Sequence, residues 1–144
     1  MLSRFSLLLL MALALAACDA FGLVRESHPA ALSQTAWRVV AIDGRAPVPG
    51  GEPTAAFDVD RVSGSAGCNS YGGRYAYDPA TGAISFGELG RTLMLCTEPA
   101  RNDVETAFMK ALVRVSDASI DPEGRLVLSG GGSEIVLAVD AVGG

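Results

Sequence analysis

The chain has 144 residues, of which 49% are hydrophobic and 19% charged, and its formal net charge is −5. A chain of this length is expected to fold as one domain, and its acidic balance excludes nucleic-acid binding through a basic surface. The same charge offers no attraction to anionic lipid headgroups, so any membrane attachment is expected to come from a lipid.

Residues 1–17 have the features of a bacterial lipoprotein signal. Arg4 precedes the apolar stretch Phe5 to Ala14, which is too short to span a bilayer as a permanent helix, and Leu15-Ala16-Ala17-Cys18 ends the segment. We expect cleavage before Cys18, whose thiol and freed amine would both carry acyl chains and anchor the protein stably. The alternatives are an ordinary secretory signal with a cysteine near its cleavage site, or a buried apolar helix that packs Cys18.

The residues after the predicted cleavage site are expected to link the anchor to the folded domain. Asp19 resembles the signal that retains lipoproteins in the inner membrane of enteric Gram-negative bacteria, so we expect the protein there, facing the periplasm, rather than in the outer membrane. Residues 18–33 lack a sustained hydrophobic period and are predicted to form a lipidated tether. His28, the only histidine, is interpreted as a solvated tether residue rather than a ligand. The folded domain is predicted over 34–141.

Short segments rich in β-branched and aromatic residues begin near Thr35. They are separated by the Gly, Pro, Asn and Asp residues that turns require, including a turn expected at Asn69 to Gly73. This pattern predicts an antiparallel sheet built from hairpins. The expected strands are Trp37 to Ile42, Ala55 to Val59, Arg61 to Gly64, Arg74 to Tyr77, Ala83 to Phe86 and Leu89 to Leu95.

One helix is predicted from Pro99 to Val115. Pro99 suits a first turn, and the apolar residues of this segment have the spacing of one helical face: Val104, Phe108, Ala111, Leu112 and Val115. After the helix, three further strands are expected to close the domain as a meander, namely Ala118 to Ile120, Arg125 to Leu128 and Ile135 to Val139.

Three cysteines are present, and Cys18 is assigned to lipidation. The compartment beyond the inner membrane permits disulfides, so Cys68 and Cys96 are predicted to pair. The alternative is two buried free thiols. A bridge would close a loop of about 29 residues and would stabilise the fold by roughly 3.5 kcal/mol in the chain-entropy description.

The predicted domain lacks the residues of common catalytic sites. A serine or cysteine nucleophile of the usual kind requires a nearby histidine, and a structural zinc site requires four Cys or His ligands. We therefore expect no enzyme activity, no metal and no cofactor. The acidic residues are spread over different turns and strands and are interpreted as solvated surface: Asp58, Asp60, Asp78, Glu88, Asp117 and Asp121.

Polar residues and glycines beside the two cysteines are expected to support the fold. Asn69 and Thr92 flank the predicted disulfide and could satisfy backbone groups where the sheet turns, a role that we favour over ligand binding. Gly64 and Gly67 are expected to permit tight backbone turns there. Tyr75 and Tyr77 fall on one face of their strand, where packing in the core is the favoured role.

The stretch from Arg61 to Tyr75, with its Gly-x-x-Gly-Cys-Asn sequence, resembles the signature of the META domain, the HslJ-like family of bacterial envelope lipoproteins. Further pieces of the resemblance follow in order over about 32–139. Its motif residues in this chain are Trp37, Gly64, Gly67, Asn69, Tyr75, Thr92, Cys96, Glu105, Phe108 and Leu112. The resemblance implies an α+β domain in which a strongly curved antiparallel sheet, a partial barrel, packs on a single helix.

The family is associated with heat-inducible expression and with tolerance of novobiocin, and the resemblance implies no enzyme activity. We expect a monomeric envelope lipoprotein that supports stress or drug tolerance by binding an unidentified envelope component. The alternatives are a carrier of a small ligand or lipid, with Phe86, Phe108 and Leu112 lining a cavity between sheet and helix, or an accessory protein similar to secretion pilotins.

Overall fold

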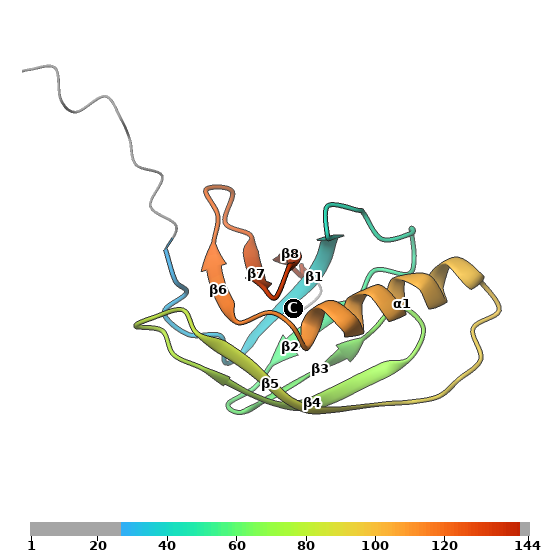
Figure 1. Ribbon diagram of the computed structural model, residues 1–144, viewed down its shortest axis with the longest axis horizontal. Coiled ribbons are helices and arrows are strands. Elements are labelled where there is room, and N and C mark those ends of the chain that lie inside the picture. Colours follow the sequence, from blue (N-terminus) through green and yellow to red (C-terminus); the bar gives the residue numbers. More distant parts are fainter. Residues whose placement is uncertain (1–26, 142–144) are drawn as a thin grey trace, which may run out of the picture.

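A single curled antiparallel sheet wraps partly around one helix in the computed structural model, which describes residues 27–141 (Figure 1). The predicted fold class is confirmed. The predicted signal, Cys18 and Asp19 lie outside the described residues. The strands are β1 (Thr35–Ile42), β2 (Thr54–Phe57), β3 (Arg61–Ser65), β4 (Ser70–Tyr77), β5 (Ile84–Arg91), β6 (Asp117–Ile120), β7 (Leu126–Gly130) and β8 (Ser133–Val139), and the helix is α1 (Pro99–Leu112).

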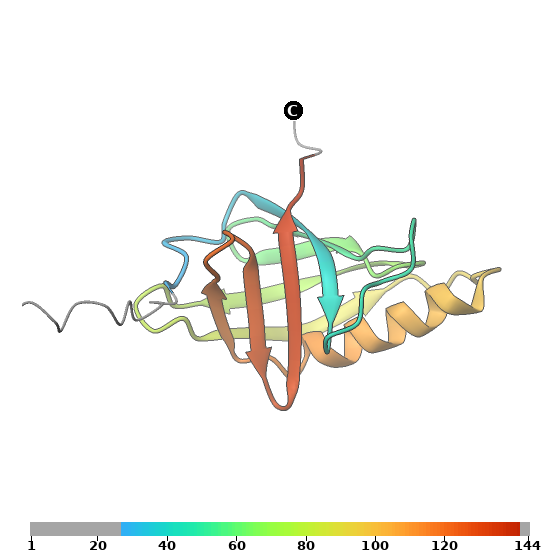
Figure 2. The same ribbon diagram turned by 90° about the horizontal axis from the view of Figure 1, so that it is seen from above.

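The sheet order is β5-β4-β3-β2-β1-β8-β7-β6, so β5 and β6 are its two edges. Curling brings these edges together at one point, where Ala83 bridges Asp117 and the N–H of Ile84 donates to the carbonyl of Ser116 over 3.1 Å. Beyond that point the edges diverge, and the chain between them forms α1 (Figure 2). The sheet is therefore a barrel that is closed at one end of its seam only.

The core lies inside the curl, between the sheet and α1. Alternate strand residues such as Val39, Leu128 and Leu137 point inward and are almost completely buried, as the period of two in a half-buried strand requires. The helix contributes Phe108, whose ring meets Tyr71 edge-on with centroids 5.3 Å apart, and Leu112. Both helix residues fill the space between sheet and helix that a carrier cavity would need.

The helix begins at Pro99 as predicted and ends at Leu112, three residues before the predicted end. Its buried face carries Phe108, Ala111 and Leu112, and also the carboxylate of Glu105. Val115 is buried as well, but it lies after the helix in the connection to β6.

Two strand predictions need correction. β4 begins at Ser70 rather than Arg74, so Gly72 and Gly73 belong to a strand and not to a turn. The expected strands Ala83 to Phe86 and Leu89 to Leu95 are one strand, β5, because a register shift at residues 87 and 88 lets pairing with β4 continue. Residues 92–95 lie outside any strand.

The predicted tether also extends too far. Residues 27–33 pack on the domain: Ser27 bridges Ile120, Tyr77 donates from its hydroxyl to the carbonyl of Pro29 over 2.6 Å, and Leu32 is only 1% exposed. His28 is exposed, and its Nδ1 lies 3.1 Å from the Ala118 carbonyl oxygen. Burial of Leu32 and these backbone contacts fix the segment on the domain, although it lacks the sustained hydrophobic period by which packed segments are recognised in the sequence.

Candidate functional site

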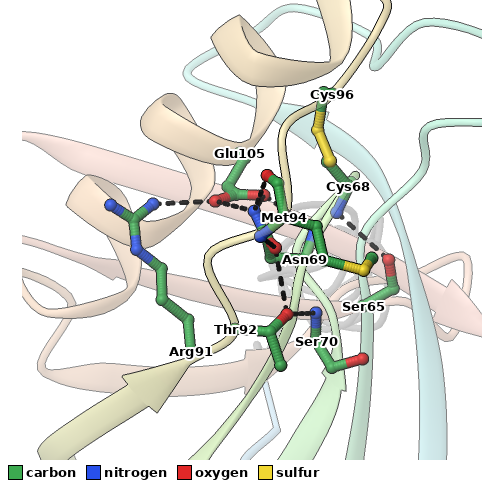
Figure 3. A network of polar contacts seen from close by, with 10 residues as sticks. Ser65, Cys68, Asn69, Ser70, Arg91, Thr92, Met94, Cys96 and Glu105 are labelled. Atoms are coloured by element: carbon green, nitrogen blue, oxygen red, sulfur yellow. Dashed lines mark hydrogen bonds and ion pairs between the residues drawn. A yellow bond between two sulfur atoms is a disulfide. The ribbon is translucent and has the colours of Figure 1, made fainter.

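Five of the predicted motif and disulfide residues meet where the turn between β3 and β4 faces the middle of α1 (Figure 3). They are Cys68, Asn69, Thr92, Cys96 and Glu105. Cys68 and Cys96 form the predicted disulfide, with Cα atoms 6.0 Å apart. The bridge ties the β3–β4 turn to the loop that precedes α1, which is why residues distant in the sequence form one cluster.

Through its side chain and its backbone N–H, Asn69 connects the β3–β4 turn to α1 and to the loop between β5 and α1. Its N–H donates to Glu105 Oε2 over 2.8 Å, and its Nδ2 lies 3.1 Å from each oxygen of that carboxylate. Its Oδ1 accepts the N–H of Met94 over 2.6 Å, and its Nδ2 donates to the Met94 carbonyl over 3.3 Å. The amide thus pairs with the backbone of residue 94 as a neighbouring strand would.

Thr92 completes the connection between β4 and the loop. Its hydroxyl donates to Asn69 Oδ1 over 3.0 Å and accepts the N–H of Ser70 over 3.1 Å. The N–H of Thr92 also donates to the Ser70 carbonyl over 2.9 Å, the last backbone pairing between β4 and β5. These contacts agree with the predicted role of Asn69 and Thr92, which is to satisfy backbone groups where the sheet turns.

Glu105 is a buried carboxylate, 4% exposed, with its charge compensated. Burial by itself would raise the pKa of Glu105, but the hydrogen bonds from Asn69 and the positive charge of Arg91 together hold this pKa below its ordinary value. Arg91 Nη1 lies 2.7 Å from Oε1, at the end of β5. The carboxylate is therefore kept ionised, which suits an ion pair rather than a proton donor.

The ligands for a metal ion are few in this cluster. A carboxylate oxygen of Glu105 and the sulfur atoms of Cys68 and Cys96 lie within 4.8 Å of one another. Because the two sulfurs are bonded to each other, neither is a thiolate, the form in which cysteine binds metals. With the disulfide formed, the cluster holds the backbone of the β3–β4 turn to the loop that precedes α1.

What the cluster braces is an apolar tip of three consecutive side chains, Leu93, Met94 and Leu95. They are 85%, 62% and 94% exposed. Asn69 holds the backbone at the centre of the tip, and the disulfide holds Cys96 directly after it. Beside the tip a surface pocket of about 400 Å³ is lined by the tip itself and by Asn69, Arg91, Asn102, Glu105 and Thr106. Large apolar side chains on a fixed, exposed backbone are typical of interaction surfaces.

The remaining motif residues lie in the body of the fold. Trp37 is buried and donates from Nε1 to Thr35 Oγ1 over 2.8 Å. Tyr75 is buried as predicted, packs edge-on against Phe57 and donates from its hydroxyl to the Asp58 carbonyl over 2.7 Å. Gly67 has φ +122° and supports the β3–β4 turn as predicted. Gly64 lies in β3 and not in a turn as predicted; a Cβ there would stand 2.2 Å from the carbonyl oxygen of Thr54, so the strand needs glycine for close packing.

Sequence reasoning missed Arg91 and the apolar tip. The spacing of Glu105, Phe108 and Leu112 could have placed the carboxylate on the buried helix face, and so indicated a cationic partner. No sequence signal identified Arg91 as that partner. The tip was expected to be the end of a strand from Leu89 to Leu95.

A half-barrel of antiparallel strands around one helix, with a disulfide beside a buried Asn–Glu pair, defines a small α+β domain class. The META domain matches residues 30–142, so the chain belongs to the META domain family. A search among curated proteins finds no match.

Solved structures show the same fold. A protein from Burkholderia xenovorans, determined by NMR, is 27% identical, with a TM-score of 0.64 over 76% of this chain and 84% of that one. A second NMR structure is 19% identical, with a TM-score of 0.57 over 74% and 90% of the two chains. A DUF4847 family protein from Bacteroides vulgatus is 15% identical, with a TM-score of 0.53 over 76% and 94%. The last two likenesses concern the fold alone.

Proposed function

We propose that this protein is a non-enzymatic envelope lipoprotein, anchored through Cys18, that binds another envelope protein through the apolar tip. The observation that carries the binding role is the exposure of Leu93, Met94 and Leu95 on a backbone fixed by the disulfide and Asn69. A rigid tip loses little conformational entropy on binding, and its apolar area contributes to affinity when it is covered.

The place of the tip in the molecule favours a protein partner over the anchoring membrane. The described chain begins at one end of the longest axis, and α1, which the tip precedes, begins toward the other end (Figures 1 and 2). With its lipid before Ser27, the domain would be held by the end that lies opposite the start of α1. Among the described residues, no helix is long and apolar enough to cross a membrane.

The physiological role we propose is tolerance of heat, envelope stress or antibiotics of the novobiocin type. It rests on membership of the META domain family and on the signal-like sequence that ends at Cys18. The lowered pKa of Glu105 and its ion pair with Arg91 support a structural rather than catalytic use of this buried carboxylate.

Photo-crosslinking in intact cells tests the binding role. A benzophenone amino acid replaces Leu95 in one strain and Val59 in a control strain, since Val59 is also apolar and 77% exposed but lies in the β2–β3 turn. We expect a crosslinked envelope protein from position 95 and none from position 59. Absence of a crosslink from position 95, or the same protein captured from both positions, would contradict the proposal.

A complementation experiment tests the physiological role. In a deletion strain, the double variant Leu93→Ser/Leu95→Ser should restore heat and novobiocin tolerance no better than an empty vector, whereas Val59→Ser should restore it fully. Full restoration by the double variant, at equal protein level, would contradict a role of the tip in tolerance.

A further inference from the structure

The two edges of the sheet differ in how their backbone groups are satisfied. On β6, the N–H of Ala118 donates to the Gly82 carbonyl over 2.8 Å, and the N–H of Ile120 donates to the Ser27 carbonyl over 2.7 Å. The loop before β5 and the chain segment that enters the domain therefore cover this edge. On β5, the N–H of Ile84 donates to Ser116, and this is the only backbone bond to the outer edge of β5 within the described residues.

The alternation of an antiparallel ladder shows which groups of β5 point outward. The bond from Thr92 to Ser70 and the bond from Asp78 to Ala83 mark residues 92 and 83 as paired with β4. In an antiparallel ladder the backbone groups of successive residues point alternately toward and away from the neighbouring strand, and the bulge at residues 87 and 88 shifts this alternation by one residue. The N–H and C=O groups of Phe86, Leu89 and Arg91 therefore point away from β4. None of these outward groups has a hydrogen-bond partner in the described part of the chain.

The faces of β5 beside this open edge carry little side-chain bulk. Gly87 and Gly90 are exposed, and a Cβ added to either would meet no atom closer than 3.7 Å. Residues 86–91 are long enough for about 20 Å of pairing. The edge runs directly into the apolar tip and its pocket of about 400 Å³, which could receive an apolar side chain at the end of an added strand.

We propose that an extended segment of the partner polypeptide adds to the sheet along β5, pairing with the outward groups of Phe86, Leu89 and Arg91. This inference rests on the proposed function, because it names how the partner of the apolar tip is held. Main-chain hydrogen bonds would supply part of the affinity, and apolar side chains against Leu93 and Leu95 the rest. Arg91 keeps its side chain on Glu105 throughout.

Charge indicates what the added segment carries and argues against a second copy of this chain. Glu88 is exposed and makes no ion pair among the described residues, so a Lys or Arg opposite it would complement the edge. The chain itself has a net charge of −5, and a second copy pairing along the same edge would bring another exposed Glu88 to it.

Crosslink mapping tests the geometry of the added strand. The benzophenone amino acid is placed at Gly87, Gly90 or Leu95, and at Ala56 as a control, because Ala56 is exposed on β2, three strands away from β5. We expect crosslinks from 87, 90 and 95 to one segment of one envelope protein, with those from 87 and 90 falling within about four residues of each other. Position 56 should give no crosslink to that segment.

The pattern of crosslinks separates this inference from the proposed function. A crosslink from 95 without any from 87 and 90, or crosslinks from 87 and 90 to scattered segments, would overturn strand addition and leave the tip as the binding surface. No crosslink from 87, 90 or 95 would overturn both. Crosslinks from 87 and 90 to this same chain would show a second copy as the occupant and overturn the inference.

A proline on the open edge provides a second test. Leu89→Pro removes an outward N–H that the fold does not use, and Leu89→Ala is the matched control for the loss of the side chain. We expect the crosslink yield from position 95 to fall about tenfold with Leu89→Pro and to change little with Leu89→Ala. Equal yields for the two folded variants would overturn strand addition, and if Leu89→Pro does not fold, the crosslink map decides.

Discussion

Asn69 and Glu105 form a buried pair in which one residue of the β3–β4 turn satisfies both oxygens of a carboxylate in the middle of α1. The Asn69 Nδ2 lies 3.1 Å from each carboxylate oxygen, and its N–H lies 2.8 Å from Oε2. Because the same amide also holds both backbone groups of Met94, the helix and the apolar tip are fixed by one side chain. The stability of the fold and the shape of the tip are therefore coupled.

Replacing Asn69 with Ala should destabilise the protein and loosen the tip. The variant leaves a buried carboxylate with fewer donors, and we expect the free energy of unfolding to fall by about 2–3 kcal/mol. Urea unfolding at pH 7 measures this change, and Ser63→Ala on an exposed position of β3 is the control. Hydrogen exchange should show faster exchange of the Met94 amide; unchanged exchange at Met94 would count against its bracing by Asn69.

The ion pair of Glu105 predicts a pH dependence. Its pKa in the folded protein lies below its ordinary value of 4.5, so as the pH falls below about 4.5 the unfolded chain takes up the proton first and the stabilisation is lost. Glu105→Gln removes the titrating group. The difference in free energy of unfolding between wild type and Glu105→Gln should be largest near pH 7 and shrink in acid. A difference that stays constant from pH 7 to pH 3 would contradict the lowered pKa.

The sequence allowed most of this cluster to be predicted, but not its charge partner. The Gly-Cys-Asn motif, Thr92 and the second cysteine indicated a braced corner, and helical spacing places Glu105 with Phe108 on one face. The pairing of Glu105 with Arg91 depends on how far the sheet curls and on where β5 ends. A hydrophobic pattern with a period of two does not encode these features.

Two features of the structure explain why β5 was predicted as two strands and the apolar tip as part of a strand. An extra residue at 87 or 88 breaks the alternation of buried and exposed positions, so one strand has the pattern of two short ones. At its end, Leu93 to Leu95 have the composition of a strand. The Asn69 side chain, and not a neighbouring strand, takes up the backbone groups of Met94, and this decides the conformation.

The glycines of the sheet offer a test of close packing. A Cβ at residue 64 would stand 2.2 Å from the Thr54 carbonyl oxygen, a backbone atom that cannot turn aside, so Gly64→Ala should cost about 2 kcal/mol or more. Gly90→Ala is the matched control, because its Cβ would come no nearer than 3.9 Å to another atom. Thermal unfolding followed by circular dichroism compares the two. Equal midpoints would show that β3 shifts freely away from Thr54.

Cysteine substitutions should separate anchoring from folding. Cys18→Ser removes the proposed site of lipidation, so the protein should move from the membrane fraction to the soluble periplasmic fraction without loss of domain stability. Cys68→Ser/Cys96→Ser opens a bridge between residues 28 positions apart and should lower the free energy of unfolding by roughly 3.5 kcal/mol. That double variant should nevertheless remain in the membrane fraction. Cell fractionation measures the membrane attachment, and urea unfolding of the purified domains measures the stability. Release of the Cys68→Ser/Cys96→Ser protein from the membrane, or retention of the Cys18→Ser protein on it, would contradict the assignment of Cys18 to anchoring and of Cys68 and Cys96 to folding.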